Sequence, residues 1–76
     1  KMNDKQIQAK LGIISGSIAD LIEQHEDLMQ EDNYITERIT MSRKSLEFFL
    51  EVGDQARALY EAKNCHQDIM CWLGWV

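Results

Sequence analysis

Apolar residues recur along this chain in two stripes whose steps alternate between four and three residues. Such steps keep side chains on one side of a helix, and no strand pattern produces them. The pattern therefore predicts an all-α fold in which two long helices form an antiparallel hairpin. A polar break at Glu31, Asp32 and Asn33 separates the stripes. The first stripe contains Ile7, Leu11, Ile14, Ile18, Leu21, His25 and Leu28, and the second contains Ile35, Ile39, Ser42, Leu46, Phe49, Gly53, Ala56 and Tyr60.

Capping residues set the expected limits of the two helices. Asn and Asp side chains accept hydrogen bonds from the early N–H groups of a helix, and Asn3 with Gln6 also fits the spacing of a capping box. Asn tolerates the left-handed conformation in which many helices end. The candidate caps are Asn3 or Asp4 for the first helix, Asp32 or Asn33 for the second, and Asn64 as its C-terminal stop. We expect a single helical domain over residues 1–76, with helix one over about 4–30, a turn over 31–33, helix two over about 34–63 and a short helical segment over 65–76.

Gly12 and Gly16 are the weak point of the first predicted helix, because a glycine inside a helix costs about 1 kcal/mol relative to alanine. Two interpretations remain open. Helix one breaks near Gly16, or glycines four residues apart form a shallow groove that another element approaches closely. In the second interpretation, the hairpin places Gly16 near Phe48 and Gly12 near Val52, so that small residues face large ones.

The second predicted helix carries more apolar surface than a hairpin can bury. Met41, Phe48, Val52 and Leu59 lie beside its main stripe. A helix that is apolar over a wide arc faces more than one neighbour. Either the C-terminal segment folds back over this surface or a second copy covers it. Two hairpins that pair as a four-helix bundle, with coiled-coil packing, are the simplest closed solution. We therefore expect a homodimer, with these four residues among those at the interface.

The C-terminal segment, residues 69–76, is apolar apart from Gly74 and contains both tryptophans. These residues either cover the open end of the bundle near Ile7 and Leu59 or form an exposed anchor for a partner. Aromatic residues dominate burial in small cores, and tryptophan is also enriched at binding hot spots. The candidate partner-binding residues of this segment are Trp72, Leu73 and Trp75.

The chain has a formal net charge of −5, and residues 11–36 contain no Lys or Arg. Such a region repels nucleic-acid phosphate, so we expect no direct binding to nucleic acid. It suits a basic protein partner, or it serves only to keep the chain soluble. The carboxylates of this candidate acidic surface are Asp20, Glu23, Glu26, Asp27 and Glu31.

Seventy-six residues allow one domain at most, and a hydrophobic content of 45% argues against disorder. No apolar run is long enough to span a bilayer, and the N-terminus lacks the apolar run of a signal peptide. If Met2 is the natural first residue, we expect a cytoplasmic protein with reduced thiols.

Cys65, His66 and Cys71 are the candidate residues for a metal site or a catalytic nucleophile. Zinc sites need four ligands, commonly at short spacing, and on a helix Cys65 and Cys71 point about 240° apart. A Cys–His nucleophile also needs an orienting group and an oxyanion site, and no motif supplies them. His25 lies on the first apolar stripe, where a structural role in the core is the favoured interpretation. We predict no catalytic, cofactor-binding or metal-binding residues.

These observations predict a small non-enzymatic protein–protein interaction module, such as an adaptor, a chaperone subunit or an inhibitor, that acts through its helical surfaces. The alternative is an acidic nucleic-acid mimic that blocks a basic DNA- or RNA-binding protein. The acidic residues between Asp20 and Asp32 support this alternative.

Overall fold

The computed structural model of the protein describes residues 2–75, which form helices and the segments that connect them, without any strand. The all-α prediction is therefore confirmed. The structure contains three α-helices, and a short 3₁₀ helix, η1, connects the first two. The elements are α1 (Asp4–Gln24), η1 (Glu26–Gln30), α2 (Tyr34–Val52) and α3 (Gln55–Trp72).

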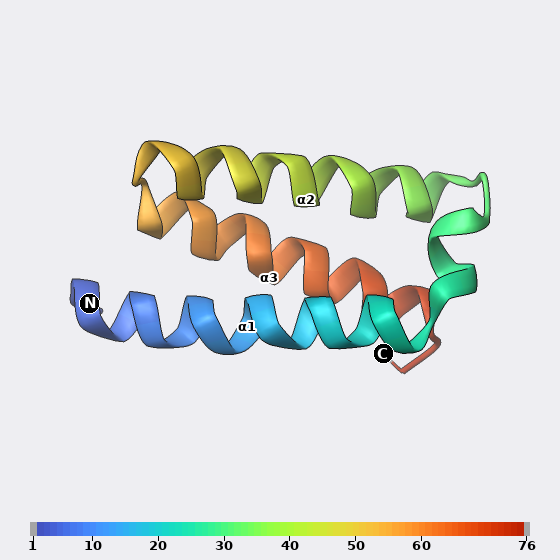
Figure 1. The fold of residues 1–76 in the computed structure, drawn as a ribbon, viewed down its shortest axis with the longest axis horizontal. Helices are drawn as coiled ribbons and strands as arrows, with labels where there is room; N and C mark the ends of the chain where they lie inside the picture. Colours follow the sequence, from blue (N-terminus) through green and yellow to red (C-terminus); the bar gives the residue numbers. More distant parts are fainter. Residues whose placement is uncertain (1, 76) are drawn as a thin grey trace.

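The three helices form an up-down-up bundle of 36 × 22 × 19 Å (Figure 1). Helices α1 and α3 run in the same direction, and α2 runs in the opposite direction. Helix α3 packs against both of the others and lies between them. The predicted hairpin of two long helices is therefore wrong, because its second helix is divided into α2 and α3. The expected four-helix dimer was to consist of two such hairpins, and this chain does not form that hairpin.

The division of the second predicted helix occurs at Gly53 and Asp54. Gly53 adopts a left-handed conformation with φ 80° and closes α2, a conformation that glycine reaches without steric cost. The Asp54 side chain then accepts a hydrogen bond from the Arg57 backbone N–H at 3.1 Å and begins α3. The expected stop at Asn64 is wrong, because Asn64 lies in the middle of α3.

The first predicted helix is shorter than expected and ends at Gln24 rather than near residue 30. His25 leaves the helical conformation with φ −127° and ψ 64°, and η1 follows. The tighter 3₁₀ turn carries the chain toward α2 and buries Leu28 completely. Residues 31–33 connect η1 to α2, which begins at Tyr34.

The starts of α1 and α2 use capping boxes. The Asn3 side chain accepts a hydrogen bond from the Gln6 N–H at 2.9 Å, and the Gln6 side chain accepts from the Asn3 N–H at 3.0 Å. Asn33 and Thr36 exchange the same two bonds at the start of α2, at 3.0 and 3.1 Å. Of the alternatives open from the sequence, Asn3 and Asn33 are thus the caps.

The core confirms the first stripe and the first half of the second, and α3 supplies the rest. Helix α3 buries a row of mostly small residues at steps of four and three, which lets α1 and α2 approach it closely. Ala56 and Tyr60, which continue the second stripe in the sequence, are exposed because the helical phase restarts at Asp54. The buried apolar residues are Leu11, Ile18, Leu21 and Leu28, then Ile39 and Leu46, and in α3 Ala58, Leu59, Ala62, Cys65 and Ile69.

Gly12 and Gly16 neither break α1 nor form a packing groove. Helix α1 continues through both residues. A Cβ atom built at either glycine meets nothing within 4 Å. Both sequence-based interpretations are wrong, because the hairpin that would have brought Phe48 and Val52 against these glycines is not formed.

Candidate interaction surface

Four large side chains form an apolar row along α2 on the side that points away from the core. Tyr34, Met41, Phe48 and Val52 are separated by seven, seven and four residues, which places them on one helical face. The opposite face of α2 carries the buried residues Thr36, Ile39 and Leu46. The side chains of the row are between 56% and 69% exposed. We call Tyr34, Met41, Phe48 and Val52 the outward row.

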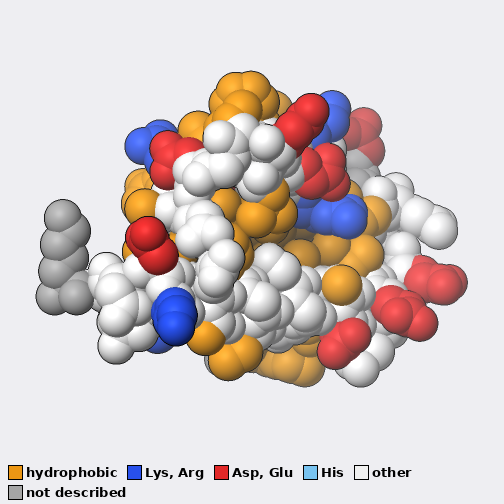
Figure 2. Space-filling model, turned by 60° about the vertical axis from the view of Figure 1, so that its left-hand side comes forward, with side chains coloured by type: hydrophobic (Ala, Val, Ile, Leu, Met, Phe, Trp, Pro, Cys, Tyr) orange, Lys and Arg blue, Asp and Glu red, His pale blue; other side chains and the backbone are white. Residues whose placement is uncertain are grey.

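Hydrophobic side chains reach the surface on the side of the molecule where α2 lies, with charged side chains of both signs around them (Figure 2). The Phe48 ring packs edge-on against Phe49, with ring centroids 5.2 Å apart and an angle of 76° between the planes. Because Phe49 is half-buried, this contact fixes the Phe48 ring to the bundle while leaving most of it exposed.

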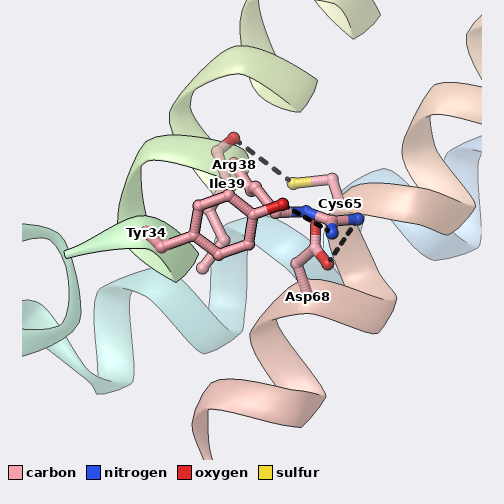
Figure 3. Close-up of polar contacts among 5 residues, drawn as sticks. All are labelled: Tyr34, Arg38, Ile39, Cys65 and Asp68. Carbon is pink, nitrogen blue, oxygen red and sulfur yellow. Dashed lines mark hydrogen bonds and ion pairs between the residues drawn. The ribbon is translucent and has the colours of Figure 1, made fainter.

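At the other end of the row, Tyr34 is fixed by Arg38 (Figure 3). The Arg38 guanidinium lies 5.7 Å from the Tyr34 ring centroid and donates a 3.5 Å hydrogen bond to the phenol oxygen. Arg38 also forms a 3.3 Å ion pair with Asp68 of α3. The Tyr34 hydrogen bond, followed by the negative charge of Asp68, raises the pKa of Arg38. Arg38 is therefore a permanent cation whose charge is already paired.

Two hollows flank Met41. The first, of about 390 Å³, has Met29 and Met41 among its lining residues and the carboxylates of Glu31, Asp32 and Glu37 on its sides. The second, of about 320 Å³, lies along α2 and is lined by Tyr34, Glu37, Arg38, Met41 and Ser42. Both hollows are open to solvent, so that side chains of a partner can enter them.

The residues at the end of α3 lie beside η1 and the C-terminal end of α1. Trp72 Nε1 donates a 3.2 Å hydrogen bond to Glu31, and Trp75 packs edge-on against His25 with centroids 6.2 Å apart. The prediction that this segment covers the end of the bundle near Ile7 is wrong, because α3 runs parallel to α1 and ends at the opposite end.

The residues predicted to bind a partner are not brought together on one surface. Met41, Phe48 and Val52 belong to the outward row, whereas Leu59 is buried in the core. Trp72 and Leu73 are half-buried against that core, and Trp75 is exposed. Sequence reasoning missed Tyr34, although its position seven residues before Met41 continues the heptad spacing. It also missed the two hollows, whose shape depends on where η1 meets α2.

The predicted acidic residues are exposed on α1, η1 and the turn that follows. They are Asp20, Glu23, Glu26, Asp27 and Glu31. Glu31 also organises the turn, because its carboxylate accepts hydrogen bonds from the Asn33 side chain at 3.0 Å and from Trp72. The other four carboxylates point to solvent without an ion pair within residues 2–75.

The cysteine and histidine residues of α3 point in different directions. Cys65 is buried, with its thiol 4.0 Å from the Ile39 carbonyl oxygen, while Cys71 is exposed. Burial raises the pKa of Cys65 to about 11, which keeps the thiol protonated at neutral pH. His66 Nε2 lies 3.3 Å from Ser17 Oγ across the α1–α3 contact. Among the described residues, no three His, Cys, Asp or Glu side chains are grouped to hold a metal ion.

No helix in residues 2–75 is both long and apolar enough to cross a membrane. Comparison of the chain with protein-family models, with curated proteins and with solved structures gives no match.

Proposed function

We propose that this chain is a small non-enzymatic protein–protein interaction module that binds its partner through the outward row of α2. The observation that supports this proposal most strongly is the heptad spacing of Tyr34, Met41, Phe48 and Val52 on a face turned away from the core. Single exposed apolar residues are ordinary, but four of them on one face of a single helix favour an interaction site.

The geometry of the row favours a helical segment as the partner structure. Apolar side chains repeated at intervals of seven and four residues match the repeat of a second helix lying alongside the first. At about 1.5 Å per residue, the row extends for roughly 27 Å along α2. A partner helix of five turns would cover this length.

Capture experiments with matched variants test the proposal. Phe48→Asp places a charge in the middle of the row, and Ile13→Asp makes the same change at an exposed residue of α1. Both residues lie outside the core, so both variants are expected to keep the wild-type circular dichroism spectrum and melting temperature. We expect the wild type and Ile13→Asp to capture the same proteins by cross-linking, and Phe48→Asp to lose them. Identical capture by all three chains would contradict the proposal.

The exposure of the acidic residues supports a second candidate function, that of an acidic mimic that occupies the nucleic-acid-binding surface of a basic protein. Residues 11–36 contain no Lys or Arg, and the carboxylates of Glu23, Glu26 and Asp27 are exposed. This function predicts salt-sensitive binding to a basic protein, because such contacts are screened by salt. Reversal of these three charges must abolish the binding, and unchanged binding would contradict the second candidate.

A further inference from the structure

We infer that the partner of the outward row is a basic amphipathic helix, whose apolar side lies on Met41 and Phe48 and whose Lys or Arg residues meet the carboxylates beside η1. This inference rests on the proposed function, because it identifies the partner of the same surface. It depends on the charges of the two hollows and on their shape.

The first hollow combines two apolar side chains with carboxylates that form no ion pair within residues 2–75. Met29 and Met41 provide flexible, polarisable side chains that adapt to the shape of an apolar partner. Glu31, Asp32 and Glu37 surround them, and within residues 2–75 none of the three forms an ion pair. A partner that brings apolar side chains alone leaves these carboxylates without a counter-charge, whereas Lys or Arg beside the apolar side chains supplies one.

The positive charge that lines the second hollow does not serve as this counter-charge. Arg38 is the one basic residue that lines either of them, and it is held by Asp68 at 3.3 Å and by the Tyr34 phenol at 3.5 Å (Figure 3). The charge that faces an incoming partner at Glu37 is therefore negative.

The second hollow has the shape that a helix knob requires. Tyr34, Glu37, Arg38 and Met41 stand at positions i, i+3, i+4 and i+7, and this arrangement is the four-residue hole that receives one side chain of a facing helix. Tyr34 and Met41 bound the hole at its two ends along the helix axis, so a large apolar side chain is the expected knob.

A second copy of this chain fits the row less well than a basic helix does. Each copy carries a formal net charge of −5. An antiparallel pairing that seats Phe48 of one copy in the hole of the other places Glu37 opposite residues 48–49 of the second copy, between its Glu47 and Glu51. Like charges across a helix pair are destabilising, and the electrostatics therefore favour a partner of opposite charge.

Binding to two synthetic peptides tests the inference. The first is an amphipathic helix of about 18 residues, the length of the row at ~1.5 Å per residue, with leucines on one side and lysines on the other. The second has glutamate in place of every lysine. In calorimetric titrations of the whole chain, we expect saturable binding of the lysine peptide at one per chain, weakened by added salt. We expect no binding of the glutamate peptide.

Matched variants locate the binding site. Glu37→Lys reverses a carboxylate that lines both hollows, and Glu47→Lys makes the same change about 15 Å along α2, at ~1.5 Å per residue. We expect Glu37→Lys to weaken binding of the lysine peptide by about fivefold, and Glu47→Lys by less than about twofold, as for exposed charge pairs. Met41→Asp is expected to abolish binding, and Ile13→Asp to leave it unchanged.

Three results would overturn the inference. The first is that the glutamate peptide binds as tightly as the lysine peptide. The second is that Glu37→Lys weakens binding of the lysine peptide no more than Glu47→Lys does, or less than Glu23→Lys on α1 does. The third is that the chain self-associates through the outward row and that Met41→Asp makes it monomeric. In the last case a second copy occupies the row, and the proposed interaction function stands. If the inference fails and Phe48→Asp also leaves protein capture unchanged, the proposed function fails with it.

Discussion

Gly53 and Asp54 are adjacent residues at the junction of two helices. Gly53 is the C-cap of α2, and Asp54 is the N-cap of α3. The Gly53 N–H donates to the Leu50 carbonyl oxygen at 3.3 Å, and the Asp54 N–H donates to the Phe49 carbonyl oxygen at 2.9 Å. The Asp54 side chain accepts from the Arg57 N–H at 3.1 Å. This pair reverses the chain, so that α3 packs between the other two helices and α2 is left with one face uncovered.

Replacing Gly53 by alanine is expected to destabilise the protein. Gly53 has a φ of 80°, and a Cβ atom in the left-handed region costs about 1 kcal/mol or more. A Cβ built there meets nothing within 4 Å, so the cost comes from the backbone conformation and not from a clash. Urea unfolding followed by circular dichroism measures the change. A Gly53→Ala protein as stable as the wild type would contradict the assigned turn.

Replacing Gly12 or Gly16 by alanine is expected to stabilise the protein, the opposite of the effect expected at Gly53. Both residues lie inside α1, and a Cβ at either position enters open space. Each Gly→Ala change should stabilise the protein by about 1 kcal/mol, the difference in helix propensity between the two residues. Lower stability of either variant in urea unfolding would indicate that another element packs on this face of α1.

Thr36 is expected to stabilise the turn between η1 and α2 through its hydroxyl group. This buried side chain accepts from the Asn33 N–H at 3.1 Å and lies 2.6 Å from the Glu31 carbonyl oxygen. Thr36→Val removes the hydroxyl at nearly constant volume and leaves these partners unpaired, at a cost of about 1–3 kcal/mol. Thr36→Ser keeps the hydroxyl and should cost less. Equal loss in both variants would show that packing, not hydrogen bonding, fixes the turn.

The buried thiol of Cys65 predicts a loss of stability in alkali. Its pKa rises from 9.0 to about 11 in the folded chain, mainly through burial. The unfolded chain therefore loses this proton first, and the stability contribution, intact below pH 9.0, is lost as the pH rises toward 11.

The free energy of unfolding, measured against pH for the wild type and Cys65→Ala, tests this dependence. The variant starts less stable because it lacks buried volume, and the gap between the two proteins should narrow above pH 9.0. Cys71→Ser changes an exposed thiol and should follow the wild type. A constant gap between wild type and Cys65→Ala would contradict the prediction.

The sequence predicted the elements that depend on local chemistry. The Asn3 and Asn33 caps and the first apolar stripe follow from hydrogen-bonding side chains and helical spacing. The division at Gly53 was missed because Ala56 and Tyr60 continue the heptad spacing across it by coincidence. The core face of α3 was missed because Ala58, Ala62 and Cys65 are small, and their burial depends on lying between two other helices.

The candidate surface could be predicted in part, for the same physical reasons. Met41, Phe48 and Val52 fall outside the main stripe of α2 and are exposed in the structure. Leu59 was grouped with these residues on the assumption of one continuous helix. Because a new helix begins after Asp54, the Leu59 side chain points into the core instead. The hollow between Met29 and Met41 could not be predicted, because it depends on the fold of η1 against α2.

Amide chemical shifts of the ¹⁵N-labelled chain, recorded during titration with the lysine peptide, test the central claim most directly. We expect the largest changes along α2 around Met41 and Phe48 and in η1 around Met29, with α1 around Ile13 unchanged. Changes centred on Asp20, Glu23 and Asp27, or the absence of changes along α2, would contradict the claim that a basic amphipathic helix binds the outward row.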